Sequence, residues 1–219
     1  MGWERRRFLA AVGGASIGGA LAWPRTVEAL ASELASGGAP DDDAFWAHVR
    51  RAFLLPDDRI YLNNGTLGPS PRVVVDAVAE HARRVAQTYP PGVSLDDLKS
   101  AVAGLLGGDP EGYVFPRNTT EAMSFVAAGL ELADGDEIVT TDHEHIGGLE
   151  PWRLAAARRG AVLRVARLPV PAARSDDLAE AVWSEVGPAT RVVSVSHLTF
   201  TTGNRLPVEE LASRCRARG

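Results

Sequence analysis

The sequence predicts an α/β fold in which a mostly parallel sheet is flanked by helices. From about residue 95 onward, segments with the apolar spacing of a helix alternate with short segments rich in β-forming residues. Turn-forming stretches such as "ADGDE" and "ARRGA" separate these segments. The chain of 219 residues is 45% hydrophobic and 23% charged, so it has enough apolar side chains to bury a core.

The first residues have the features of an export signal. Arginines at residues 5–7 precede Phe8, and small and apolar residues continue to Ala22. This apolar run is short for a transmembrane helix, and "ALA" at residues 20–22 offers a cleavage site. Because Arg-Arg-x-Phe-Leu resembles a twin-arginine signal, we expect residues 1–31 to direct export to the periplasm or the extracellular space. An uncleaved membrane anchor is the alternative, and we expect no membrane association once the signal is removed.

The segment after the signal is expected to be a linker that leads into one folded domain. Residues 32–43, "SELASGGAPDDD", are small, polar and contain glycine and proline. The folded part is expected at residues 44–219. It begins with helices at 44–55 and 72–87, the second of which has valines at helical spacing. Between them, "RIYLNNGTLGPSP" predicts an irregular loop.

The remaining elements alternate in type and show no tandem repeat. Helices are expected at residues 95–106, 120–132, 149–158, 176–186 and 208–217. Strands are expected at residues 113–115, 137–141, 162–168 and 191–196. Ligands of open α/β sheets bind at the carboxyl ends of the strands. The candidate site loops are therefore "PRNTTEA", "DHEHIGG" and "SHLTFTTGN", each of which follows a strand.

The loop "NTTEA" combines a helix cap with free hydrogen-bond donors. Asn118 is expected to be the N-cap, which places Glu121 at the third helical position. Thr119 and Thr120 then present backbone N–H groups and hydroxyls at the positive end of the helix dipole. Such an arrangement is suited to a phosphate, although the same residues also occur where they only cap a helix.

The loop "DHEHIGG" contains two histidines. In extended geometry His143 and His145 would point to one face of the strand end, and Asp142 and Glu144 to the other. Three interpretations are open: a metal site, an imidazole lying against an aromatic ligand, or two partly exposed histidines in a polar loop. The other three histidines of the chain show no pairing, and we predict no metal site.

Charge and cysteine content exclude several function classes. The formal charge of −5 and the pI near 5.6 give no basic face, so no nucleic-acid binding is expected. The chain has a single cysteine, Cys215, which excludes an intramolecular disulfide and a cysteine zinc cluster.

Four ordered motifs carry a family resemblance: "YLNNGTLGPSP", "NTTEA", "GDEIVTTDHEHIGGLEPW" and "VVSVSHLTFTTGNRLPVEEL". Together they resemble the aminotransferase class V family of fold-type I pyridoxal-phosphate enzymes, with the isopenicillin N epimerase-like branch closest and cysteine desulfurases in the same class. The resemblance implies that residues 44–219 are the N-terminal part of the large domain of a PLP-dependent transferase-like fold. It also implies that this domain is incomplete at the C-terminus.

The resemblance implies roles for individual residues. Thr119 and Thr120, next to Asn118, match the residues that hold the phosphate of pyridoxal 5′-phosphate. His145 matches the histidine that stacks on the pyridine ring. Cysteine desulfurases have an asparagine facing the cofactor in the third loop, and this sequence has Phe200 there, which weakens a desulfurase interpretation.

In the family, the lysine that forms the Schiff base and the acidic partner of the pyridine nitrogen lie beyond the helix predicted at 208–217. The single lysine, Lys99, is in a helix before the phosphate loop, where we expect it to be solvated. No catalytic residue is therefore predicted. We expect the chain to be the N-terminal portion of an enzyme that acts on an amino acid. As a truncated product or fragment it is expected to be inactive, and the complete enzyme is expected to be a homodimer. The alternative is a non-catalytic protein that binds pyridoxal phosphate or another phosphate ligand.

Overall fold

The computed structural model describes residues 43–88, 95–171 and 174–218. The predicted signal segment and all of the linker except Asp43 lie outside these residues. The chain divides into two compact units, one up to Val114 and one from Phe115. Each unit is described separately below.

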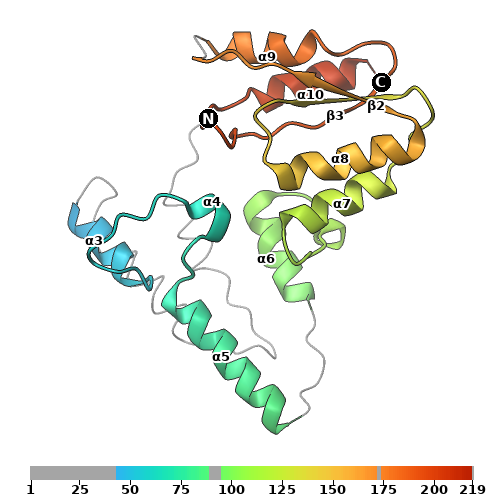
Figure 1. Ribbon diagram of the computed structural model, residues 1–219. Coiled ribbons are helices and arrows are strands. Elements are labelled where there is room, and N and C mark those ends of the chain that lie inside the picture. The colour runs from blue at the N-terminus through green and yellow to red at the C-terminus, as the bar shows by residue number, and fades with distance from the viewer. Residues whose placement is uncertain (1–42, 89–94, 172–173, 219) are drawn as a thin grey trace. The chain divides into compact units, whose positions relative to one another are not determined.

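All regular elements described in the first unit are helices, joined by irregular segments. Its elements are α3 (Asp43–Arg51), α4 (Asn64–Leu67), α5 (Arg72–Gln87), α6 (Asp96–Leu106) and the short 3-10 helix η1 (Pro110–Gly112) (Figure 1). Helix α5 has the bounds that the valine spacing predicts. Helix α3 ends earlier than expected, and the loop predicted to be irregular contains α4. The Tyr61 hydroxyl donates to the carbonyl oxygen of Leu67 at 2.8 Å, which links the segment before α4 to the last residue of that helix.

The strand predicted at residues 113–115 is wrong. This segment has no regular secondary structure, and the side chain of Val114 is 76% exposed. A segment of three residues becomes a strand only where a neighbouring strand accepts its backbone hydrogen bonds, and the described residues provide no such neighbour. The β propensity of these three residues was therefore insufficient to form a strand.

The second unit is a parallel α/β structure. Its helices are α7 (Thr119–Gly129), α8 (Ile146–Arg159), α9 (Ser175–Trp183) and α10 (Val208–Ala217), and its strands are β1 (Glu137–Thr141), β2 (Val162–Ala166) and β3 (Thr190–Val193). The strand order is β2-β1-β3, and both pairings are parallel. The predicted parallel sheet is confirmed, and β1 and α10 have the predicted bounds.

Helices cover both faces of this sheet (Figure 1). One core cluster joins Val139 of β1 to α9 and α10 through residues such as Val182 and Leu211. The other joins Ile138 of β1 to α7 and α8 through residues such as Trp152. Ile138 and Val139 are both 0% exposed, because successive side chains of a central strand point into opposite cores.

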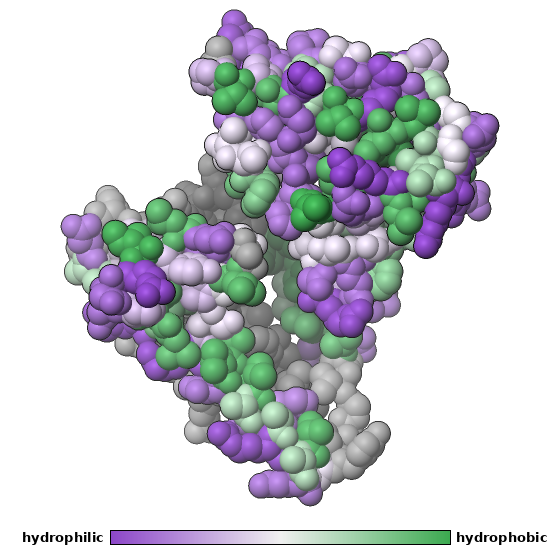
Figure 2. Space-filling view, in the orientation of Figure 1, coloured by the Kyte–Doolittle hydropathy of each residue, from purple (hydrophilic) through white to green (hydrophobic). Residues whose placement is uncertain are grey.

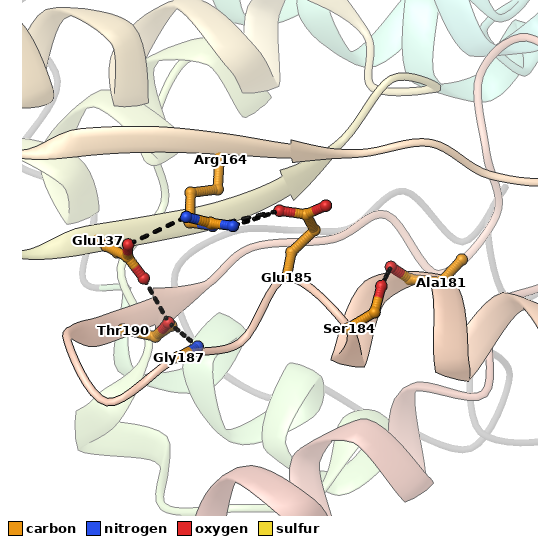
Figure 3. A network of polar contacts seen from close by, with 7 residues as sticks. All are labelled: Glu137, Arg164, Ala181, Ser184, Glu185, Gly187 and Thr190. Carbon is orange, nitrogen blue, oxygen red and sulfur yellow. Dashed lines mark hydrogen bonds and ion pairs between the residues drawn. The ribbon is translucent and has the colours of Figure 1, made fainter.

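A polar network ties the strands together on one side of the unit (Figure 3). Arg164 of β2 donates to Glu137 of β1 at 3.2 Å and to Glu185, which follows α9, at 2.9 Å. Thr190, at the start of β3, bonds to the other carboxylate oxygen of Glu137 and to the N–H of Gly187. The network therefore links all three strands of the sheet and the segment after α9.

Among the described residues, no helix is both long enough and apolar enough to cross a bilayer.

Candidate functional site

The start of α7 is built as the sequence predicts. Asn118 is the N-cap, and its side-chain oxygen accepts a hydrogen bond from the N–H of Glu121 at 2.9 Å. Its carbonyl oxygen accepts from the N–H of Ala122. Thr119 and Thr120 occupy the first two helical positions, and their side chains are exposed.

The carboxylate of Glu121 reaches past the N-cap, which a standard capping box would not predict. It accepts from the backbone N–H of Arg117 at 2.7 Å and from the guanidinium of the same residue at 2.6 and 2.8 Å. These bonds, the one from the Arg117 side chain above all, hold the pKa of the Glu121 carboxyl below its ordinary value. Glu121 is therefore already paired within its own helix start.

This pairing leaves donors available at the same helix end. The first N–H groups of an α-helix have no acceptor within the helix. Asn118 satisfies those of Glu121 and Ala122, and no described residue accepts from the N–H groups of Thr119 and Thr120, which leaves them for another acceptor. The start of α7 thus combines two backbone donors, two hydroxyls and the helix dipole, and these groups fit a phosphate.

The starts of α7 and α8 lie close together at Gly147. A Cβ atom placed on Gly147 would lie 2.4 Å from the Thr120 hydroxyl oxygen and 3.2 Å from Nδ1 of His145. The space that a side chain at residue 147 would fill is therefore taken by Thr120 and His145. Two residues that the family resemblance selects from separate loops are neighbours here.

His145 caps α8. Its Nδ1 accepts a hydrogen bond from the N–H of Gly147 at 3.0 Å, so the ring proton of the neutral imidazole is on Nε2. The ring contacts Phe200 of the third loop edge-to-face, with centroids 4.7 Å apart and planes at 84°. Both side chains are exposed. An exposed imidazole of fixed orientation beside the start of α7 fits a planar aromatic ligand whose phosphate is bound there.

The expectation that His143 and His145 share a face is wrong, because the chain turns at residues 142 and 143 instead of continuing as a strand. His143 is buried, and its Nδ1 lies 3.2 Å from the hydroxyl of Thr202. No group of three or more potential ligands that could hold a metal occurs among the described residues. The arrangement of His143 and His145 therefore gives no support to the interpretation of this pair as a metal site.

Two carboxylates that the sequence patterns did not indicate tie the second loop to the third loop and to the segment after β2. The Glu144 carboxylate accepts hydrogen bonds from Thr141 at the end of β1 and from the N–H and hydroxyl of Ser196 in the third loop. The Asp142 carboxylate accepts from the N–H of Leu168, which follows β2. The signal that could have identified them is their position directly after β1, the central strand, where a carboxylate reaches the loops on either side.

Similar proteins show the family to which this chain belongs. The family model for aminotransferase class-V matches residues 68–219. The chain belongs to the aminotransferase class-V family. Isopenicillin N epimerase of Amycolatopsis lactamdurans is 36% identical over 184 residues, which cover 80% of this chain and 46% of that protein. A probable cysteine desulfurase of Halobacterium salinarum is 34% identical over 169 residues, 71% of this chain and 40% of that protein. The chain spans about half the length of these curated relatives.

Solved structures confirm the predicted fold. A C-DES variant with glycine covalently linked to its PLP cofactor superposes with a TM-score of 0.66 and 28% identity, over 77% of this chain and 46% of that one. The cysteine desulfurase CsdA of Escherichia coli has a TM-score of 0.64 over 79% of this chain and 46% of that one. At 24% identity, the second comparison supports the fold alone.

Proposed function

We propose that this chain provides the phosphate-binding and ring-binding part of a pyridoxal-phosphate-dependent enzyme that acts on an amino acid. The observation that carries the proposal is the exposed start of α7, where Thr119 and Thr120 lie beside the capping histidine of α8. Family membership and the PLP-linked glycine of the C-DES structure support pyridoxal 5′-phosphate as the cofactor.

Each residue has a defined part in this proposal. The N–H groups and hydroxyls of Thr119 and Thr120 bind the phosphate, and Asn118 holds the helix start that orients them. The His145 ring, fixed by Gly147 and Phe200, lies against the pyridine ring. When bound, pyridoxal phosphate supplies an electron sink for bonds at the α-carbon of an amino acid.

We further propose that the chain of 219 residues binds the cofactor without turning over substrate. Covalent attachment of pyridoxal phosphate requires the free amine of a lysine. The single lysine, Lys99 of α6, forms an ion pair with Glu111 at 3.7 Å, and its side chain is only 21% exposed. The ion pair with Glu111 occupies the amine that would have to attack the aldehyde.

The test measures binding of a cofactor form that cannot react with lysine. Pyridoxamine 5′-phosphate has no aldehyde, so calorimetric titration with it reports the phosphate and ring contacts alone. Pyridoxamine, which lacks the phosphate, is the ligand control. We expect Thr120→Ala to weaken the binding of pyridoxamine 5′-phosphate by about tenfold or more, because a hydrogen bond to a charged group is lost. Ser124→Ala is the matched control, since the Ser124 hydroxyl bonds to the Thr120 carbonyl oxygen inside the same helix. Equal binding of the two ligands by the wild-type chain would refute the phosphate site.

The alternative is a binding protein without catalysis, with which the pairing of Lys99 agrees equally well. Borohydride reduction of the protein produced from its native gene, in the presence of pyridoxal phosphate, separates the two. A pyridoxyl group on a lysine other than Lys99 supports the enzyme. Reversible binding with no such label supports the alternative.

Export by a twin-arginine route remains a proposal, because residues 1–31 lie outside the described part of the chain. Replacing Arg5 and Arg6 by lysine is expected to retain the protein in the cytoplasm, as cell fractionation would measure. Secretion of this variant at the wild-type level would contradict the route. We also propose a homodimer for the complete enzyme, which sedimentation of the native product tests.

A further inference from the structure

Gly147 lies where the two predicted cofactor contacts meet. It is the second residue of α8, and the point at which its Cβ would stand is 2.4 Å from Oγ1 of Thr120. Real Cβ atoms do not approach other heavy atoms so closely. The same point is 3.2 Å from Nδ1 and 3.5 Å from Cε1 of His145. A methyl group at this position would therefore press on the phosphate donor and on the ring of the capping histidine together.

The side chain of Thr120 can avoid such a methyl group in two ways. Threonine in a helix has few χ1 rotamers, so a blocked hydroxyl must either turn to another rotamer or separate the two helix starts. Either response shifts Oγ1 relative to the N–H groups of Thr119 and Thr120. These donors bind one anion well only when their relative positions are kept.

We infer that Gly147 is a positioning residue for the phosphate site: the absence of a side chain there keeps the Thr120 hydroxyl in its binding orientation. This inference rests on the proposed function. It goes beyond that function because Gly147 would touch no ligand and would still control the affinity for the ligand, through the side chain of Thr120.

The next residue provides a matched control. Gly148 is also in the first turn of α8, and a Cβ placed on it would find its nearest atom, Oε2 of Glu144, at 4.0 Å. Both substitutions by alanine change helix propensity in the same direction and by a similar amount. Gly147→Ala and Gly148→Ala therefore differ in what the new methyl group meets.

The experiment is a double-mutant cycle on the full chain, with pyridoxamine 5′-phosphate as the probe in calorimetric titration. We expect Gly147→Ala to weaken binding by about tenfold, as loss of a bond to a charged group would. Gly148→Ala should bind within about twofold of wild type, as expected for a substitution that disturbs no contact. In the Thr120→Ala background the hydroxyl and its clash are gone and only the looser approach to the His145 ring remains, so Gly147→Ala should have a much smaller further effect.

The outcomes separate this inference from the proposed function. If the wild-type chain does not bind the probe, the proposed function fails and the inference falls with it. If the wild type binds and Gly147→Ala matches Gly148→Ala, the inference alone is overturned. It is also overturned if Gly147→Ala weakens binding equally with and without Thr120, because the effect would then be a general disturbance of α8. Should Gly147→Ala fail to fold, folding of the double variant with Thr120→Ala supports the clash, and failure of both variants contradicts it.

Discussion

The two units of the chain form their helices from the same kind of sequence pattern but bury them very differently. From Phe115 onward, helices on both faces of a parallel sheet enclose two apolar cores. Up to Val114, α5 has the predicted valine spacing, yet none of its residues is buried in the described part of the chain. Ile60 and Leu62 are each 84% exposed. Figure 2 shows apolar side chains along α5.

This difference separates what local sequence determines from what it does not. Apolar residues at helical spacing define which face of a helix will be covered, but burial requires a partner surface. The central strand β1 provides that surface in the second unit, because each of its successive side chains enters one of two cores. The described residues of the first unit contain no strand with this role.

The largest expected effect comes from truncating the central strand. Ile138→Ala removes a side chain that is 0% exposed and leaves a cavity, which should lower the free energy of unfolding by about 2–5 kcal/mol. Val78→Ala in α5, where the side chain is 65% exposed, should change it by no more than about 0.5 kcal/mol. Urea unfolding followed by far-UV circular dichroism measures both. Comparable losses in the two variants would mean that α5 is covered in solution and that the contrast between the units is false.

A smaller effect is expected from a partly buried hydrogen bond that joins α8 to the residue after β3. The indole N–H of Trp152, a residue only 2% exposed, donates to the Ser194 hydroxyl at 2.8 Å. Ser194→Ala removes the acceptor and should cost about 1–3 kcal/mol. Ser184→Ala is the control, because that hydroxyl caps the exposed end of α9 by donating to the Ala181 carbonyl oxygen (Figure 3). An equal effect of both changes would show that the Trp152 bond does not stabilise the core.

The sequence predicted the second unit more completely than the first for a physical reason. Helix α10 and strand β1 have strong local patterns that agree with their tertiary surroundings, so their bounds match. The segment at residues 113–115 has β propensity without a pairing partner and forms no strand. Helix α8 begins at Ile146, before the expected residue 149, because His145 caps it. Histidine is not among the residues that usually predict an N-cap.

The candidate site follows the same rule. Asn118 and the two threonines could be predicted, since capping acts within a few residues. The approach of Gly147 to Thr120, the contact of His145 with Phe200 and the bonds of Glu144 to Ser196 could not, because each joins segments that are distant in the chain. The expectation for His143 was wrong because the alternation of side chains along a strand was assumed to continue beyond β1, where the chain turns.

A surface network should contribute less than either core change. Hydrogen bonds to Glu185, together with the charges of Glu137 and Glu185, raise the pKa of the Arg164 guanidinium, which therefore stays charged. Arg164→Met leaves these two carboxylates without their shared partner and should lower the melting temperature of the chain, more at low salt than at high salt. Arg174→Met is the control, because the side chains of Arg174 and its partner Asp176 are both solvent-exposed. A loss independent of salt would assign the effect to packing of the arginine stem.

The smallest expected effect is at the start of α7, and its sign follows from the lowered pKa of Glu121. A carboxyl whose pKa is lower in the folded state stabilises the fold above its ordinary pKa and loses that contribution as the pH falls through its folded value. The difference in melting temperature between wild type and Glu121→Gln should therefore be present at neutral pH and disappear on acidification. Arg117→Gln should lose less than Glu121→Gln, because the backbone N–H of residue 117 still donates to the carboxylate. A difference that grows toward acid pH would contradict the pairing and reopen Glu121 as a group available to a ligand.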